Sequence, residues 1–286
     1  MSRLSALPPP LVTTIIPAYN HETYVADAIG SVIAQSHPNM EIVIIDDGSS
    51  DGTRTAIERK LSATPSHHRI IFETQDNAGV CATLNRGLQL SSGEFIQFLA
   101  SDDMYLPEKT SHCLRGFGGL DEAFAATYCD GLVIDQNGRR IGKFSDIYPR
   151  PISKNNYREL LVSNWIPAMG LLYKAAALHS LGGFDENLKF EDWDLLLRLS
   201  RRYKIHFVGQ ELFEYRLHGD NLHNNMPVML DGLEAMFAKH PRMNSFQEFV
   251  RAGSDRSMRR LLRTVSPGNA ELYGRLLLRR ARTRRI

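Results

Sequence analysis

Short apolar runs alternate with helical patterns over the first hundred residues, and this alternation restricts the fold more than any other feature of the sequence. The apolar runs are Leu11–Ile16, Glu41–Ile45, Arg69–Phe72 and Glu94–Leu99. The segments between them have helical patterns over Glu22–Gln35, Asp51–Leu61 and Ala78–Leu90. Strands that alternate with helices in this way predict βαβ units, and therefore a parallel sheet with helices on its faces. Such sheets bind ligands beyond the carboxyl ends of their strands.

The pattern changes after Asp103. A strand is predicted at Phe124–Cys129, and the dipeptide Asn137-Gly138 predicts the turn of a hairpin, which would add antiparallel strands to the sheet. After a break that holds two prolines, the sequence predicts a helix over Asp192–Tyr203 and a last strand over Phe213–Leu217. Beyond residue 222 the sequence has helical patterns only.

Composition and charge narrow the class of protein. Hydrophobic residues make up 43% of the 286-residue chain and charged residues 23%, which are ordinary globular values. No apolar run reaches the roughly 18 residues of a membrane span, the start lacks the core of a signal peptide, and the three cysteines form no Cys-x-x-Cys pair. We therefore expect a cytoplasmic protein.

The net charge of +2 conceals a basic tail. Residues 251–286 hold eleven arginines against two acids, so the remaining chain is acidic overall. The tail has no aromatic-basic pattern of the kind that binds nucleic acid. It could place the protein at the inner face of an anionic membrane, or pack on the acidic body or on a second subunit of a homo-oligomer.

Polar side chains follow three of the predicted strands. Tyr19 and Asn20 come after the first strand, Asp46-Asp47-Gly48-Ser49 after the second, and Ser101-Asp102-Asp103 after the fourth. Crowded carboxylates resist joint ionisation, and a hard cation such as Mg²⁺ or Mn²⁺ relieves that repulsion while it binds a nucleotide diphosphate. The alternative is that these acids only form turns and cap the following helices.

The order of these motifs resembles that of the family 2 glycosyltransferases, which have the GT-A fold. The resemblance runs from Leu11 to Leu222. Its supporting motifs are Asn77-x-Gly79, Leu84-Asn85-x-Gly87, Gly182-Gly183-Phe184-Asp185, Glu191-Asp192-Trp193-Asp194 and Tyr215-Arg216-x-His218. It implies an α/β fold with a Rossmann-like, mostly parallel central sheet flanked by helices. Residues 1–222 would form the catalytic domain, with a nucleotide-binding half over 11–103 and an acceptor-binding half over 104–222, and residues 223–286 a helical, basic extension.

The resemblance also implies roles for single residues. Those expected to bind the nucleotide sugar are Pro17, Tyr19, Asn20, Asp47, Asn77 and Asp102. Asp103 and His218 are expected to bind Mn²⁺ or Mg²⁺, and Asp192 to be the catalytic base. Leu84 stands where many members have an arginine, and the adjacent Arg86 would turn away by about 100° on a helix.

Some polar and aromatic residues are expected to have no catalytic part. Asp194 would lie about 200° around its helix from Asp192. Trp165 and Met169 could form a wall for the acceptor or lie in the core. We expect the His67-His68 pair and His223 at the surface.

The expected activity is an inverting, metal-dependent transfer of a sugar from a nucleoside diphosphate to a hydroxyl of a glycan or a lipid-linked acceptor. UDP is the first choice of nucleotide, then dTDP and GDP, because Asp47 could pair with a pyrimidine N–H. Two alternatives stay open: a non-catalytic module that binds nucleotide sugars, and a sugar nucleotidyltransferase. The second usually has a glycine-rich basic loop after the first strand, which Pro17-Ala18-Tyr19-Asn20 does not provide.

Overall fold

The computed structural model describes residues 8–150, 156–161, 163–188, 191–219, 221 and 226–240. Within these ranges the strands form one nine-stranded sheet. The strands are β1 (Val12–Ala18), β2 (Met40–Asp47), β3 (Arg69–Gln75), β4 (Phe95–Phe98), β5 (Met104–Tyr105), β6 (Phe124–Asp135), β7 (Arg140–Lys143), β8 (Leu171–Lys174) and β9 (Lys204–Leu217). The helices are α1 (Val25–Ile33), α2 (Thr53–Ala63), α3 (Val80–Leu90), α4 (Lys109–Arg115), α5 (Phe144–Ile147), α6 (Asn156–Leu160), the 3-10 turn η1 (Ala168–Gly170), α7 (Ala175–Ser180), α8 (Glu191–Ser200) and α9 (Met226–Lys239).

The sheet has a parallel half and a mixed half. The strand order is β3-β2-β1-β4-β8-β6-β9-β5, with β7 paired to β6, and the first four strands are all parallel. Strand β8 is antiparallel to both β4 and β6, while β9 runs parallel to β6. Strands β1, β4 and β9 therefore point the same way, and their carboxyl ends lie along one edge. The four strands and three helices predicted for the first hundred residues are confirmed, as is the α/β fold class.

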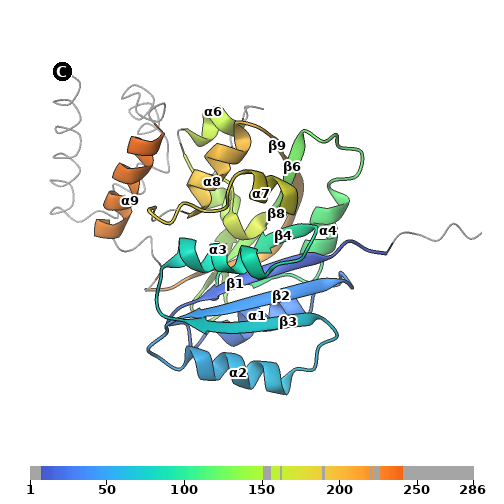
Figure 1. The fold of residues 1–286 in the computed structure, drawn as a ribbon, viewed down its shortest axis with the longest axis vertical. Helices are drawn as coiled ribbons and strands as arrows, with labels where there is room; N and C mark the ends of the chain where they lie inside the picture. Colours follow the sequence, from blue (N-terminus) through green and yellow to red (C-terminus); the bar gives the residue numbers. More distant parts are fainter. Residues whose placement is uncertain are drawn as a thin grey trace, which may run out of the picture.

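Helices cover both faces of the parallel half. Figure 1 shows α3 on one side of the sheet and α1 and α2 on the other. Successive residues of β1 reflect this, because Ile15 packs with the α3 residues and Ile16 with the α1 residues. Helix α3 lies so close to β1 that a Cβ added at Gly87 would stand 2.4 Å from Ile15 Cγ2. Helices cover both faces of these strands and exclude solvent, which explains why the strands are continuous apolar runs in the sequence.

The second half contains both predicted and unpredicted elements. The hairpin between β6 and β7 turns at Asn137-Gly138 as expected, with Gly138 at a φ of +81°. Strands β5 and β8 and the beginning of β9 were not predicted. The expected boundary near residue 222 and the basic tail from residue 251 both lie outside the described residues, as does His223. Among the described residues, no helix combines the length and apolar character of a membrane-spanning segment.

Candidate active site

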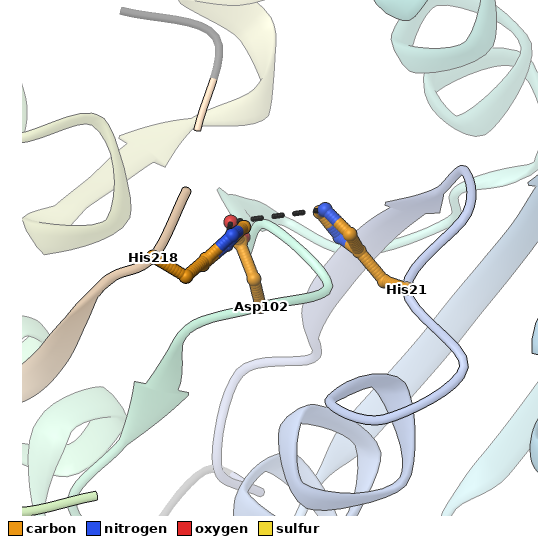
Figure 2. A group of neighbouring side chains, drawn as sticks. All are labelled: His21, Asp102 and His218. Carbon is orange, nitrogen blue, oxygen red and sulfur yellow. Dashed lines mark hydrogen bonds and ion pairs between the residues drawn. The ribbon is translucent and has the colours of Figure 1, made fainter. Parts of the chain in front are cut away.

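Three side chains converge at the edge where the parallel strands end. His21 follows β1, Asp102 follows β4 and His218 follows β9, and Figure 2 shows them facing one another across these strand ends. His218 Nε2 lies 3.0 Å from Asp102 Oδ2, and His21 Nε2 lies 3.9 Å from the same oxygen. One donor atom from each residue lies within 4.8 Å of the other two. Residues separated by most of the chain thus form one cluster of nitrogen and oxygen donors.

Hydrogen bonds fix the orientation of this cluster. His21 Nδ1 lies 2.8 Å from Ser101 Oγ, which leaves the other ring nitrogen facing Asp102. Asn221 Nδ2 lies 3.3 Å from Asp102 Oδ2. Burial disfavours the charged form of Asp102, but the hydrogen bond from His218 and the charge of His21 outweigh burial, so the pKa of this carboxyl is lowered. Asp102 therefore carries its negative charge among imidazoles.

Asp103 is directed differently from its neighbour. Its Oδ1 accepts a hydrogen bond from the backbone N–H of Arg216 at 2.8 Å, and the Arg216 side chain donates from Nε to the Asp102 carbonyl at 3.0 Å. Burial and the adjacent charge of Asp102 raise the pKa of Asp103 well above its usual range. The guanidinium of Arg216 also lies 4.9 Å from the centre of the Tyr24 ring. The structure thus brings Asp102, and not Asp103, into the cluster with the histidines.

Residues 17–20, at the end of β1 and just after it, form a partly exposed surface beside this cluster. Tyr19 is 47% exposed, which makes it one of the few large apolar side chains open to solvent in the described structure, while Pro17 is half-buried. Asn20 has a φ of +53°, and its backbone N–H donates to Ser49 Oγ while its side-chain oxygen accepts from Ser50 N. Asn20 therefore ties the end of β1 to the loop after β2.

Asp47 holds the turn between β3 and α3. Its carboxylate accepts hydrogen bonds from Gln75 Nε2, Ala78 N and Gly79 N at 2.8–3.0 Å. Asn77 lies exposed in the same turn. A Cβ at Gly48, whose φ is +71°, would stand 2.7 Å from Asn77 N, so glycine is needed for the two loops to touch.

A second pair of acids lies in the first turn of α8. Asp192 Oδ2 accepts a hydrogen bond from Asn164 Nδ2 at 2.8 Å. Burial raises the pKa of Asp192, and burial together with the charge of Asp192 raises the pKa of Glu191 to about 8. The pKa of Tyr215 is raised by its burial and by the charges of Asp103, Asp102 and Asp192. The charges of both groups of acids therefore act on one tyrosine of β9.

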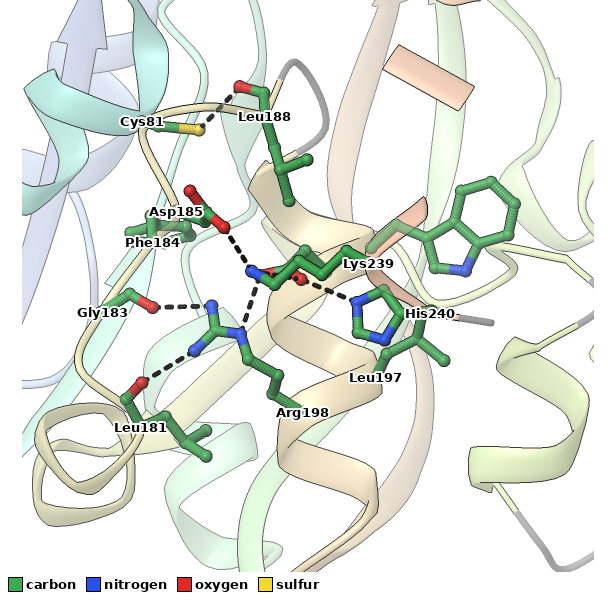
Figure 3. A network of polar contacts seen from close by, with 12 residues as sticks. Cys81, Leu181, Gly183, Phe184, Asp185, Leu188, Leu197, Arg198, Lys239 and His240 are labelled. Atoms are coloured by element: carbon green, nitrogen blue, oxygen red, sulfur yellow. Dashed lines mark hydrogen bonds and ion pairs between the residues drawn. The ribbon is translucent and has the colours of Figure 1, made fainter. Parts of the chain in front are cut away.

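Asp194 lies within a network of basic side chains. This side chain is 1% exposed and lies 2.7 Å from Arg198 Nε, 2.9 Å from Lys239 Nζ and 2.8 Å from His240 Nε2. Lys239 also contacts Asp185, as Figure 3 shows. The hydrogen bonds from His240 and Lys239 and the charge of Arg198 outweigh burial and lower the pKa of Asp194 to about 2. These contacts join helix α9 to helix α8, which begins with Glu191 and Asp192.

Known proteins share sequence similarity with this chain. A sequence model described as "Glycosyl transferase family 2" matches residues 13–176, more than half of the chain. The chain belongs to this family. The protein is therefore a glycosyltransferase, in agreement with its relatives.

Two relatives illustrate how far the similarity extends. An uncharacterized glycosyltransferase of Rickettsia typhi is 29% identical over 248 residues, which cover 84% of this chain and 74% of the relative. The chondroitin synthase of Escherichia coli is 32% identical over 213 residues, which cover 74% of this chain and 30% of the synthase. This family 2 glycosyltransferase thus matches most of the first relative and less than a third of the second.

Solved structures show the same fold at lower identity. Mannosyltransferase PcManGT from Pyrobaculum calidifontis, in complex with GDP-Man and Mn²⁺, has a TM-score of 0.66 and 17% identity, covering 95% of this chain and 81% of that one. The S. aureus TarS structure in complex with UDP-GlcNAc has a TM-score of 0.61 and 19% identity, covering 86% of this chain and 73% of that one.

Several expectations about the glycosyltransferase are settled by burial and contacts. Leu84 lies in the core, and Arg86 turns away to pair with Glu73 at 2.8 Å. Trp165 and Met169 are both buried, which favours the core alternative. The expectation of a surface His67-His68 pair is wrong for His68, which is buried between the end of α1 and the start of β3.

Two residues of the site were missed from the sequence. His21 directly follows the Pro17–Asn20 motif, and its position beyond a strand end was the available signal. Asn164 had no such signal, because its partner Asp192 is 28 residues away and the intervening chain forms β8 and α7.

Proposed function

We propose that this enzyme transfers a sugar from a nucleoside diphosphate, with UDP as the first choice, to a hydroxyl of a glycan or lipid-linked acceptor, with inversion at the anomeric carbon. The observation that carries the proposal is the presence of two groups of acids whose charges both act on Tyr215. One group holds Asp102 among histidines, and the other holds Asp192 half-buried with a raised pKa. A leaving diphosphate and a proton acceptor are thereby provided for on two sides of one site.

The surface formed by residues 17–20 is the proposed nucleoside site. Tyr19 offers an exposed ring for the base, with Pro17 and Asn20 beside it and Asn77 in the opposite turn. Asp47 already accepts three N–H groups, and a carboxylate has about four lone-pair sites. One further donor, such as the imide N–H of uracil, can therefore be accepted. The complex of the TarS structure with UDP-GlcNAc supports this choice of nucleotide.

The donor cluster suits a divalent cation. A set of two imidazoles and one carboxylate within 4.8 Å fits Mn²⁺, which accepts both nitrogen and oxygen ligands. In the proposal His21, Asp102 and His218 hold the ion, with Asp103 adjacent to it. The Mn²⁺ in the PcManGT structure supports this assignment. A bound cation would neutralise charge on the diphosphate, a Lewis-acid contribution of several kcal/mol in general.

The proposed chemistry is a single displacement. Asp192 accepts the proton of the acceptor hydroxyl while that oxygen forms a bond to the anomeric carbon. The bond from the anomeric carbon to the diphosphate oxygen breaks, and its electron pair leaves with the diphosphate. A general base of this kind contributes typically ~10²–10⁴-fold to the rate. The relative's name, chondroitin synthase, supports a glycan as the acceptor class.

The test is a thermal-unfolding panel with UDP, dTDP and GDP, each with Mn²⁺ or with EDTA. A ligand at a hundred times its dissociation constant stabilises by ~2.7 kcal/mol, which is a measurable shift in Tm. We expect UDP to raise the Tm only with Mn²⁺, and Asp102→Ala to remove that rise.

The matched control is Glu122→Gln. Glu122 is an exposed acid that precedes β6, so it lies at the opposite end of the strands, and this variant should respond as the unaltered chain does. An equal UDP shift in EDTA would refute the metal site. A response to GDP alone would refute the choice of nucleotide but leave the sugar-transfer proposal standing.

A further inference from the structure

Asn164 is a polar side chain that faces Asp192 from a different part of the chain. It lies between α6 and η1, whereas Asp192 lies in the first turn of α8, and the Nδ2 of Asn164 is 2.8 Å from Asp192 Oδ2. An ionised carboxylate can only accept hydrogen bonds. The amide nitrogen must therefore point at Asp192, which also fixes where the amide oxygen points.

Hydrogen bonds of the neighbouring residue Trp193 hold Asn164 and Asp192 in position. The indole N–H of Trp193 donates to the carbonyl of Leu160 at 2.7 Å and so ties α8 to the segment that leads to Asn164. The backbone N–H of Trp193 donates to Asp192 Oδ1 at 2.6 Å. Each oxygen of Asp192 thus has one donor, and the carboxylate is held in a single orientation.

The other end of the Asn164 amide is unusual. Its Oδ1 is buried and has no hydrogen-bond partner among the described residues. Burying an amide oxygen in this way is unfavourable for folding. An asparagine retained only for stability would be expected to use both ends of its amide. The single bond that Asn164 does make is to the carboxyl proposed as the base.

We propose that Asn164 is a positioning residue for sugar transfer, which holds the Asp192 carboxylate in its orientation and keeps it ionised. This inference rests on the role of Asp192 in the proposed function. A base must be deprotonated before the acceptor binds, and Asp192 is in surroundings that favour its protonated form.

The charges around Asp192 explain why a donor is needed there. Burial raises the pKa of Asp192, and the hydrogen bond from Asn164 lowers it. Among the described residues, the titratable groups whose pKa values respond to the charge of Asp192 are Glu191 on α8, Tyr173 on β8 and Tyr215 on β9. These groups are acids, so they add no positive charge near Asp192. Asn164 thus opposes the effect of burial on the carboxylate.

The test measures the pKa of Asp192 directly, by a pH titration of the full chain with ¹³C-carboxyl-labelled aspartate. The signal of Asp192 is the one that disappears in Asp192→Asn. We expect Asn164→Ala to raise the pKa of Asp192 by about one unit, because a hydrogen bond to the charged form is lost. The isosteric Asn164→Asp places two carboxyls together, and we expect a larger rise with packing preserved.

The matched control is Asn156→Ala. Asn156 is an asparagine of α6 whose Nδ2 donates to the Ile205 carbonyl at 3.1 Å, so this variant also loses one amide hydrogen bond. A purely structural role for Asn164 predicts the same Asp192 pKa in all four proteins, and that result would overturn the proposal. Failure of the proposed function shows differently, as an Asp192→Asn enzyme that still transfers sugar at the normal rate.

Discussion

The acids after β4 and the acids at the start of α8 belong to one site but have opposite surroundings. Asp102 lies beside two imidazoles, and its pKa is lowered despite burial. Asp192 lies beside Glu191, and its pKa is raised. The first environment stabilises a negative charge next to imidazole groups, whereas burial in the second favours the protonated carboxyl. The same type of side chain thus has two different surroundings, which in the proposed function serve the leaving diphosphate and the acceptor.

A third acid shows that this difference is local. Asp194 is two residues from Asp192 on the same helix, yet hydrogen bonds from His240 and Lys239 and the charge of Arg198 lower its pKa to about 2. The helix therefore has one acid that is kept charged for anchoring and another that can gain a proton. The pKa values of these two acids therefore depend on their positions around the helix, although they are only two residues apart.

The largest expected effect comes from removing the proton acceptor. Asp192→Asn keeps the volume of the side chain but cannot take a proton, so we expect transfer to fall by ~10²–10⁴-fold. Nucleotide binding should be nearly unchanged, because this residue faces the acceptor side. Steady-state kinetics with calorimetry of UDP and Mn²⁺ separates the two effects. Normal turnover by this variant would shift the role of base to Glu191.

The second expected effect is on stability, through the anchor of α8. The double change Lys239→Ala and His240→Ala leaves the buried Asp194 with Arg198 alone among its three basic partners. Breaking a buried ion pair generally costs about 3–5 kcal/mol, and we expect a loss near 3 kcal/mol because Arg198 remains. Chemical denaturation measures it. Arg54→Ala removes an exposed pair with Glu58, and this control should cost less than about 0.5 kcal/mol.

The smallest expected effect is a change in the pH dependence of stability. The pKa of Glu191 is 4.5 in its unperturbed state and about 8 in the folded protein. A raised pKa means that the folded state binds the proton more tightly, so this contribution is complete below pH 4.5 and is lost as the pH rises to about 8. We expect Glu191→Gln to flatten the decline in Tm over that range. An unchanged slope would show that Glu191 is ionised at neutral pH.

The parallel half of the sheet could be predicted because the patterns that identify its strands and helices lie within short segments of the sequence. Strands β1, β2 and β4 are buried apolar runs, β3 is a partly exposed one, and each helix between them has its own apolar repeat. Strand β8 has only the four residues Leu171–Lys174, which is too short to show a pattern. Strand β9 contains Gly209 and Gln210 with positive φ angles, and these interrupt its alternation, so only its end was recognised.

The residues of the site also divide into those that stand in local sequence motifs and those that are joined only by tertiary contacts. Asp102, His218 and Asp192 stand in motifs that can be read along the chain. The contact between His21 and Ser101 joins residues 80 positions apart, and that between Asn164 and Asp192 depends on how α6 packs on α8. No local pattern encodes such contacts, since they exist only once the sheet has formed.

The pairing of β4 with β8 sets the order in which the newly made chain can fold. The parallel half can assemble β3-β2-β1-β4 as soon as residue 98 has left the ribosome, but the far edge of β4 pairs with Tyr173 and Lys174. Ribosomes add roughly 5–20 residues per second, so this edge stays bare for several seconds while residues 99–170 are made. An unpaired apolar strand is a template for pairing with another chain. Slow translation between β4 and β8 would therefore favour aggregation of nascent chains, and a chaperone that covers Phe95–Phe98 would prevent it.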